Sequence, residues 1–369
     1  MSRFRFELAT TADDADLRQI LADTPMPGRI TVSFRREPSY FDAAQVDGRF
    51  RQVVAARDYE ENRLVGFGSR SVSERYVNGR PETIGYLTSL RLLPAYRNRG
   101  LVARGYAFFR KLHADGRARL YLTTIAERNT LALALLTSGR AGLPTYHYAG
   151  RYHTLAFPVV RRRRAPRASG DADFRPATAD DLPAVLRFLE TVGPRRQFFP
   201  HYQAGDFFAH DGTMKDLRPT DMVLALRRGQ LVGMLAGWDQ HRFRQTVVHG
   251  YEWPLGWLRP FYNAWATGCG KPRLPGTGDS FRYLTAALPL VAEDDPRVFA
   301  LLLEALQSEA GPWEYALLGL HETDPLLTVV KTYRATWYST RLYLVCWEDG
   351  EGVRAALDGR PPYLELGTL

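Results

Sequence analysis

The sequence predicts an α/β protein made of two similar halves. Strand-like runs alternate with amphipathic helical runs, and short stretches of the first half recur in the same order in the second. A polar, arginine-rich segment, residues 161–173, separates the halves. A chain of 369 residues is long enough for about two domains, which we place at residues 1–160 and 174–369.

The first half contains a predicted β-hairpin that leads into a basic loop and a helix. Asn78-Gly79 lies between two β-rich runs, and an Asn-Gly pair favours the tight turn of an antiparallel hairpin. The second run ends at Pro94 and is followed by a basic loop that contains Gly100. Apolar residues at helical spacing mark the buried face of the next helix: Leu101, Val102, Ala103, Tyr106, Phe109 and Leu112.

The basic loop has the composition of an anion site. The first backbone N–H groups of a helix have no partner inside the helix and carry the positive end of its dipole. A pyrophosphate can lie on such groups, and Arg97, Arg99 and Arg104 add positive charge. Gly100 allows the backbone to come close to phosphate oxygens. Beyond this helix, the sequence predicts a strand over 119–125 and a helix over 129–136.

This order of elements resembles the acyl-CoA-binding core of the GNAT N-acetyltransferases. Their loop has the pattern Arg/Gln-x-x-Gly-x-Gly/Ala; Arg97 and Gly100 fit it, whereas Val102 stands where Gly or Ala is usual. The resemblance implies a twisted mixed β-sheet flanked by helices, with two strands that splay apart and hold the pantetheine arm of acetyl-CoA. The implied contacts are the main-chain groups of Leu90, Arg91 and Leu92 with pantetheine, Arg97, Asn98, Arg99, Gly100, Leu101, Val102 and Ala103 with the pyrophosphate, and Asn129 with the cofactor arm.

The internal repeat extends the resemblance to a tandem architecture. The paired stretches are 4–14 with 174–181, 63–66 with 230–233, 86–90 with 283–287, 127–129 with 322–324, and 144–146 with 331–333. When Tyr86 is aligned on Tyr283, the carboxylates of Glu293, Asp294 and Asp295 replace the basic loop. They would repel a pyrophosphate, and Asp295 before Pro296 predicts a helix capped by its own side chain. We therefore expect a degenerate second copy that does not bind CoA.

The resemblance implies direct transfer of an acetyl group from acetyl-CoA to an amine, which requires a base and an acid. The sequence departs from the family here, because Leu136 replaces the usual Tyr acid and Thr124 replaces a Glu base. The remaining catalytic candidates are Tyr86, Glu82 and Glu127, with Tyr146 as a further possible acid. Strand alternation places Tyr86, Thr88, Leu90 and Leu92 on one face.

Each candidate also has a structural interpretation. Tyr86 is more simply a packed strand tyrosine, because Tyr283 repeats it in the copy without a CoA loop. Glu82 can be a hairpin residue and Glu127 a polar loop residue. The missing Tyr and Glu support an alternative function, a non-catalytic acyl-CoA-binding or regulatory protein. The acceptor and the oligomeric state cannot be read from the sequence.

Composition restricts the other partners. No run reaches the roughly 18 to 20 apolar residues of a membrane span, and the N-terminus lacks an apolar signal core. Cys269 and Cys346 form no disulfide or metal pattern, so we expect a cytoplasmic protein without a metal. The net charge is +9, but the run 161–164 is better explained as a solvated linker than as a nucleic-acid site. Aromatic insertions at 195–202 and from 251 onward could line a substrate groove, although packing is the commoner role.

Overall fold

The computed structural model describes residues 3–140, 142–159, 168–169, 172–269, 271–309 and 311–369. Its strands are β1 (Phe4–Leu8), β2 (Ile30–Arg35), β3 (Phe50–Asp58), β4 (Arg63–Val77), β5 (Arg80–Leu92), β6 (Leu120–Ala126), β7 (Thr145–Pro158), β8 (Ala168–Ser169), β9 (Ala172–Pro176), β10 (Met222–Arg227), β11 (Gln230–Trp238), β12 (Gln245–Tyr251), β13 (Tyr283–Val291), β14 (Tyr315–His321) and β15 (Thr336–Cys346). Its α-helices are α1 (Asp14–Asp23), α2 (Tyr40–Ala43), α3 (Leu101–His113), α4 (Thr130–Leu136), α5 (Leu182–Val192), α6 (Leu255–Gly268), α7 (Pro296–Glu309), α8 (Leu327–Val330) and α9 (Glu351–Ala355).

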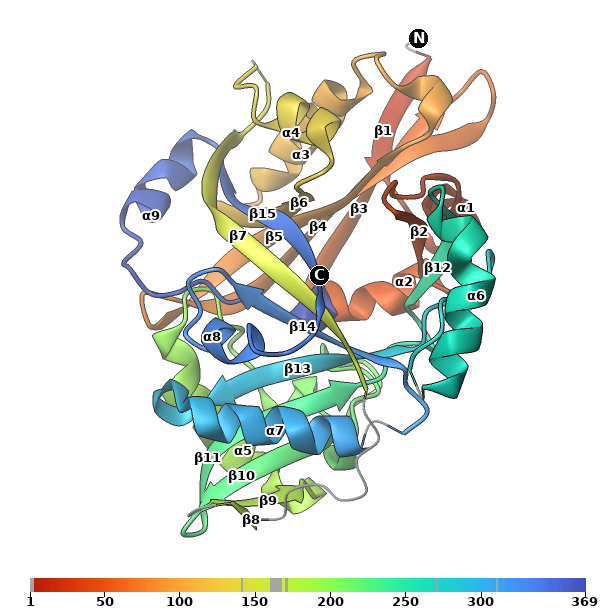
Figure 1. Ribbon diagram of the computed structural model, residues 1–369. Coiled ribbons are helices and arrows are strands. Elements are labelled where there is room, and N and C mark those ends of the chain that lie inside the picture. The colour runs from red at the N-terminus through yellow and green to blue at the C-terminus, as the bar shows by residue number, and fades with distance from the viewer. Residues whose placement is uncertain (1–2, 141, 160–167, 170–171, 270, 310) are drawn as a thin grey trace.

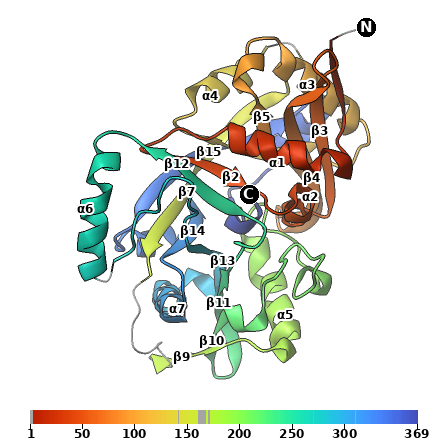
Figure 2. The ribbon, with the colours of Figure 1, turned by 90° about the vertical axis from the view of Figure 1, so that its right-hand side faces the viewer.

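Most of the described strands join one mixed sheet that runs through both halves (Figure 1). The sheet has 13 strands in the order β1-β3-β4-β5-β6-β15-β7-β14-β13-β11-β10-β9-β8. A separate pair, β12 with β2, joins the second half to the first, and α6 follows it at the edge of the molecule (Figure 2). The predicted α/β class with mixed sheets is therefore confirmed.

The local sequence signals correspond to the observed elements. Asn78 and Gly79 have φ values of 51° and 81° and connect β4 to β5, as the Asn-Gly hairpin requires. The first repeat is equally clear, because Thr10 with Asp13 and Thr178 with Asp181 form the same capping box before α1 and α5. The second aligned pair of stretches, 63–66 and 230–233, begins β4 and β11.

The two halves exchange their last strands. β15, from the end of the chain, pairs with β6 of the first half along Thr340↔Ala126 to Cys346↔Leu120. β7, from the first half, pairs with β14 of the second along Tyr315↔Pro158 to His321↔Tyr152. β15 and β7 also pair with each other and make the two sheets continuous. The boundary at 161–173 thus divides the sequence, while each sheet is completed by the other half.

Part of the predicted linker, 161–173, forms strands. Ala168–Ser169 form β8, and β9 already begins at Ala172. The arginine run 161–164 lies outside the described residues.

In both halves, two parallel strands pair at one end and diverge at the other, and we call this opening a fork. Comparison of the two forks shows that one of the repeat alignments was wrong. β5 pairs with β6 only at Gly85↔Tyr121 and Tyr86↔Leu122, whereas β13 pairs with β14 from Tyr283↔Tyr315 to Ala286↔Leu318. Each first strand then has a bulge with one left-handed residue, Ser89 (φ 57°) or Leu288 (φ 53°). Superposing these bulges aligns Tyr86 with Thr285, so the alignment with Tyr283 was wrong by two residues.

The two aromatic insertions differ in burial. In the first insertion, Phe198, Phe199 and Tyr202 are buried in the core, which confirms packing for that segment. In α6 of the second, Trp257, Phe261 and Trp265 remain 68%, 64% and 50% exposed, so the packing interpretation was wrong there.

Candidate functional site

The fork between β5 and β6 opens immediately beyond Tyr86. From Leu87 to Leu92 the backbone of β5 has no ladder partner on β6, because the strands diverge there. At the start of the opening, the Thr123 hydroxyl donates a hydrogen bond to the Leu87 carbonyl at 2.7 Å. Beyond that contact, the inner edge of β5 offers main-chain N–H and C=O groups of the kind that pair with an extended ligand.

The bulge at Ser89 changes which residues share a face of β5. Leu87, before the bulge, packs in one core with Phe109 of α3, and Leu90 and Leu92, after it, line an apolar pocket beneath α3. Tyr86 lies in the core on the other face. The expectation that Tyr86, Leu90 and Leu92 share one face was therefore wrong, because one extra residue in a strand reverses the alternation.

The basic loop between β5 and α3 is exposed and carries two left-handed residues. After a 3₁₀ turn over Pro94–Tyr96, Asn98 has φ 61° and Gly100 has φ 68°. Gly100 is the N-cap of α3 and has no side-chain capping bond, so the first N–H groups of the helix stay available. A Cβ atom at Gly100 would meet nothing within 4 Å. The loop therefore combines accessible amides with exposed Arg97 and Arg99.

The other predicted cofactor residues border the same fork. Leu90 is 37% exposed, Arg91 and Leu92 are half-buried, and Ala103 is exposed on the first turn of α3. Leu101 is buried and Val102 is half-buried beneath that turn. Asn129 is exposed and caps α4, where its side-chain oxygen accepts a hydrogen bond from the Ala132 N–H at 3.2 Å. Their contacts with acetyl-CoA remain predictions.

Tyr86 closes the fork on the face opposite α3. Its side chain is 4% exposed, and its hydroxyl lies 3.1 Å from the Thr124 hydroxyl, so the two groups share a hydrogen bond across the strands. Burial raises the pKa of Tyr86 to about 12. The phenol is therefore protonated at neutral pH and can donate a hydrogen bond or a proton. Thr124, which occupies the position of a Glu base in some GNAT relatives, is its direct partner.

The structure does not bring Glu82 to the fork. Glu82 is exposed in the paired part of β5, four residues before Tyr86 and on the closed side, which is about 13 Å along a strand. Glu127 does lie at the open end of β6, but its carboxylate accepts a hydrogen bond from Arg151 Nε at 2.7 Å. Of the predicted acids and bases, Tyr86 alone is at the branch point itself.

A second phenol pair lies on the α3 face and was only half anticipated. The hydroxyl of Tyr146, on β7, shares a hydrogen bond with the hydroxyl of Tyr106, on α3. Burial raises the pKa of both phenols, that of Tyr106 to about 12. The sequence identifies Tyr146 as a possible acid and places Tyr106 only in the buried face of the helix. It could not predict that the two tyrosines meet, because the position of β7 depends on the exchange of strands between the halves, which has no local signal in the sequence.

The corresponding fork of the second half is occupied by the protein itself. The connection from β13 to α7 has four residues (292–295), against eight (93–100) from β5 to α3. Asp295 accepts hydrogen bonds from the N–H groups of Arg297 at 2.9 Å and Val298 at 3.4 Å, so the predicted self-capped helix is confirmed. Beside the bulge, the buried Glu365 carboxylate accepts the Leu288 N–H at 2.9 Å.

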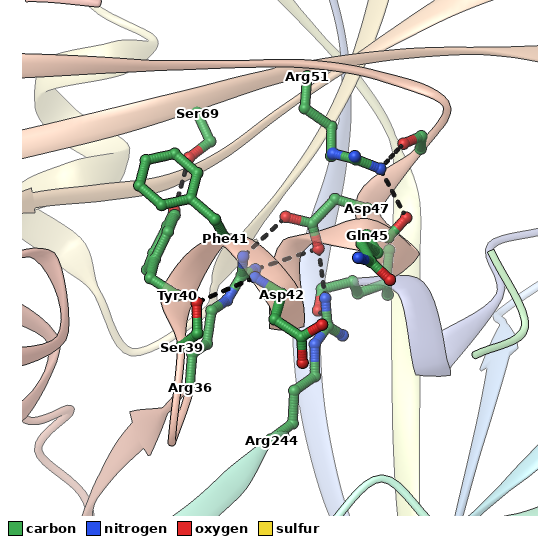
Figure 3. Close-up of polar contacts among 12 residues, drawn as sticks. Arg36, Ser39, Tyr40, Phe41, Asp42, Gln45, Asp47, Arg51, Ser69 and Arg244 are labelled. Atoms are coloured by element: carbon green, nitrogen blue, oxygen red, sulfur yellow. Dashed lines mark hydrogen bonds and ion pairs between the residues drawn. The ribbon is translucent and has the colours of Figure 1, made fainter. Parts of the chain in front are cut away.

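A polar cluster lies beside the first fork, where the halves meet (Figure 3). Asp47 is 5% exposed and accepts hydrogen bonds from Arg36 Nη1 at 2.8 Å and Arg36 Nη2 at 3.1 Å. Arg244, which directly precedes β12, forms an ion pair with the same carboxylate and donates to main-chain oxygens of Gly367 and Leu369. Burial lowers the pKa of Arg244 to about 10. No sequence signal joined these residues, because they come from separate segments.

In the described part of the chain, one group has the geometry of possible metal ligands: His147, Cys346 and Glu351, with ligand atoms within 4.8 Å of one another. The Glu351 carboxylate accepts hydrogen bonds from His147 at 2.8 Å and from Arg354 Nε at 2.8 Å. Burial raises the pKa of the Cys346 thiol to about 12. The three side chains therefore satisfy one another as a hydrogen-bonded group.

Both halves contain two parallel strands that diverge, a bulge in the first of these strands, and a loop that leads from it into a helix. These features define a tandem GNAT fold, and solved structures have the same fold. A GCN5-related N-acetyltransferase from Sphaerobacter thermophilus matches with TM-score 0.55 and 12% identity over 100% of this chain and 99% of that one. N-myristoyltransferase from Saccharomyces cerevisiae, solved with myristoyl-CoA, gives 0.60 and 9% over 94% and 79%. A GCN5-related N-acetyltransferase from Anabaena variabilis gives 0.51 and 10% over 93% and 72%.

No protein-family model and no curated protein sequence matches the chain. The TM-scores over 93% or more of this chain show the fold. At identities of 9 to 12%, any statement on chemistry depends on the site residues themselves. Among the described residues, no helix has the length and apolar character needed to cross a membrane.

Proposed function

We propose that this protein is an acyl-CoA-dependent N-acyltransferase that transfers an acetyl group from acetyl-CoA to an amine. The observation that carries the proposal is the open fork between β5 and β6, bordered by the exposed loop 97–100 and by Tyr86. In the second half, the equivalent fork is occupied by Glu365 and the equivalent loop is short. The proposal therefore assigns one acetyl-CoA to each chain.

The protein's contribution to the chemistry follows from Tyr86. Attack of the amine forms a C–N bond and breaks the C–S bond; the amine loses a proton, and the leaving thiolate gains one. With a pKa of about 12, the Tyr86 phenol can donate to an oxygen or sulfur atom but cannot accept the proton of the amine at neutral pH. The amine proton leaves through water, and most of the rate comes from holding the reactants together.

One observation favours a second candidate function, a non-catalytic acyl-CoA-binding protein. Leu136 and Thr124 stand at the positions of the usual GNAT acid and base. Release of the CoA thiol from acetyl-CoA in the presence of a panel of amines distinguishes the two functions. Thiol release with an amine supports the transferase, whereas tight binding of acetyl-CoA without release with any amine supports the binding protein.

The cofactor site is tested by Gly100→Asp with calorimetric titration of acetyl-CoA. The change adds a negative charge where we place the pyrophosphate, and we expect loss of detectable binding. Gly116→Asp is the matched control, because Gly116 has the same φ of 68° and equally open space at the other end of α3. The assignment is contradicted if Gly100→Asp binds like the control, or if the wild-type protein binds two molecules per chain.

A further inference from the structure

Arg91 is an unpaired cation at the edge of the fork. Its side chain is half-buried, its Nε atom is buried without a hydrogen-bond partner, and Nη1 donates to the carbonyl of its neighbour Leu90 at 3.1 Å. No carboxylate pairs with Arg91 among the residues that the structure describes. A guanidinium has five N–H donors, so most of its hydrogen-bonding capacity is left for something outside the chain.

Arg91 points to the same face of the sheet as Tyr86. Its strand neighbour Phe67 stacks edge-on against Tyr40, with ring centroids 5.3 Å apart, on the face covered by α1 and α2. The charged and phenolic groups that act on Arg91 are Tyr40, Arg36 and Tyr338. The side chain of Arg91 thus lies on the face opposite α3, although residue 91, as part of the strand, also borders the apolar pocket under that helix.

Positive charge exceeds negative charge around this position. Arg36 acts on both Arg91 and Arg244, so three guanidinium groups gather where Asp47 is the carboxylate that pairs with two of them. Burial and the neighbouring Arg36 lower the pKa of Arg91. A cation held away from water without a counter-charge is unfavourable, and an anion that binds there recovers this free energy.

The geometry points to an oxyanion-recognition site at Arg91, and we propose that the acceptor amine carries a carboxylate or phosphate group that Arg91 binds. This inference rests on the proposed acyl transfer. Arg91 and Tyr86 are five residues apart across the bulge, which is about 13 to 16 Å along a strand. An elongated acceptor can span this distance, and a shorter one needs the Arg91 side chain to extend towards the fork. Planar, forked guanidinium groups suit both oxyanions, and Arg36 already binds the Asp47 carboxylate in that manner.

The test compares acceptors with and without the oxyanion, and each kcat/KM is expressed per concentration of unprotonated amine, because loss of the carboxylate charge also lowers the pKa of a neighbouring amine. Glycine, leucine and 6-aminohexanoate are paired with their amides, and O-phosphoethanolamine with ethanolamine, in a thiol-release assay with acetyl-CoA. We expect at least one acid to exceed its neutral partner by tenfold or more in kcat/KM. The carboxylate pairs and the phosphate pair distinguish the two sources of the oxyanion. The inference is overturned if every neutral partner is as good as its acid.

Three variants test whether Arg91 carries the preference. Arg91→Gln removes the side-chain charge and keeps the main-chain groups assigned to pantetheine, so we expect it to raise KM for the preferred acid tenfold or more while acetyl-CoA still binds. Arg91→Lys should keep part of the preference, because lysine supplies the positive charge but not the planar guanidinium geometry. Arg110→Gln, an exposed position at the far end of α3, is the control for loss of one charge. An Arg91→Gln protein that loses acetyl-CoA affinity instead would assign Arg91 to the cofactor and refute the inference.

A binding readout separates this inference from the proposed function. Each acid and its neutral partner is titrated calorimetrically into the protein saturated with CoA, where no transfer can occur. Binding of an acid that Arg91→Gln abolishes supports the oxyanion site even if no amine is acetylated. Equal binding of acids and neutral partners overturns the site even if transfer is observed.

Discussion

Replacing Asp47 by Asn should destabilise the protein strongly, because it removes the carboxylate between two buried guanidinium groups. The side chains of Asp47, Arg36 and Arg244 are 5%, 9% and 12% exposed. Asn keeps the shape but turns one acceptor oxygen into a donor that faces a guanidinium. Removing one partner of a buried ion pair costs about 3 to 5 kcal/mol, since the other charge is left uncompensated.

This cost can be converted into a shift of the melting temperature. Unfolding entropy is about 2.1 cal/mol/K per residue, which gives about 0.8 kcal/mol/K for this chain and a shift of about 4 to 6 °C. The measurement is thermal unfolding followed by tryptophan fluorescence and circular dichroism together. Glu7→Gln is the control, because its pair with Arg57 is partly exposed and Arg57 keeps Asp13, so we expect less than about 1 kcal/mol. An Asp47→Asn protein that melts with the wild type would refute the view of a water-excluded ion cluster.

Further outcomes follow from the same structure. Tyr86→Phe should lower kcat by about ten- to a thousandfold without changing acetyl-CoA affinity in calorimetry, and a wild-type rate would remove Tyr86 from the mechanism in favour of Tyr146. Glu82→Gln and Glu127→Gln should both remain active in the thiol-release assay, and inactivation of either would restore it as a base. Asp295→Ala should cost about 1 kcal/mol through the lost cap and leave acetyl-CoA affinity unchanged, whereas tenfold weaker binding would contradict a degenerate second half. Hydrogen bonds from Arg354 and then His147 lower the pKa of Glu351 to about 2. The ionised Glu351 carboxylate therefore stabilises the folded protein above about pH 4.5, and this stabilisation is lost as the pH falls towards 2. The difference in melting temperature between wild type and Glu351→Gln should shrink over that range, and a difference that stays constant would refute this role of Glu351.

The sequence predicted what local chemistry determines. The Asn78-Gly79 turn, the buried face of α3 except for the exposed Ala103, the Asn129 cap and the self-capped start of α7 all depend on residues a few positions apart. These signals were enough for the class of fold and for the loop before α3. They were also enough to separate a basic loop from its acidic counterpart in the second half.

The misplaced features depend on a single residue or on distant segments. One extra residue at Ser89 reversed the faces of β5, so Arg91 lies on the face of Tyr86 while Leu90 and Leu92 turn to α3. Alternation counted along a sequence cannot show such a bulge. Arg36, Asp47 and Arg244 meet only after both halves have folded together, and nothing in their spacing indicates it.

The exchanged strands have a consequence for how the protein is made. During synthesis from the N-terminus, β6 leaves the ribosome long before β15, its antiparallel neighbour in the finished sheet. Until then, the edge of β6 that faces away from β5 and from the proposed catalytic fork has unpaired backbone groups that could bind a wrong strand. Activity should therefore arise only after nearly the whole chain has been translated, and a fragment that stops before Thr336 should need a separately supplied β15 segment to complete its sheet.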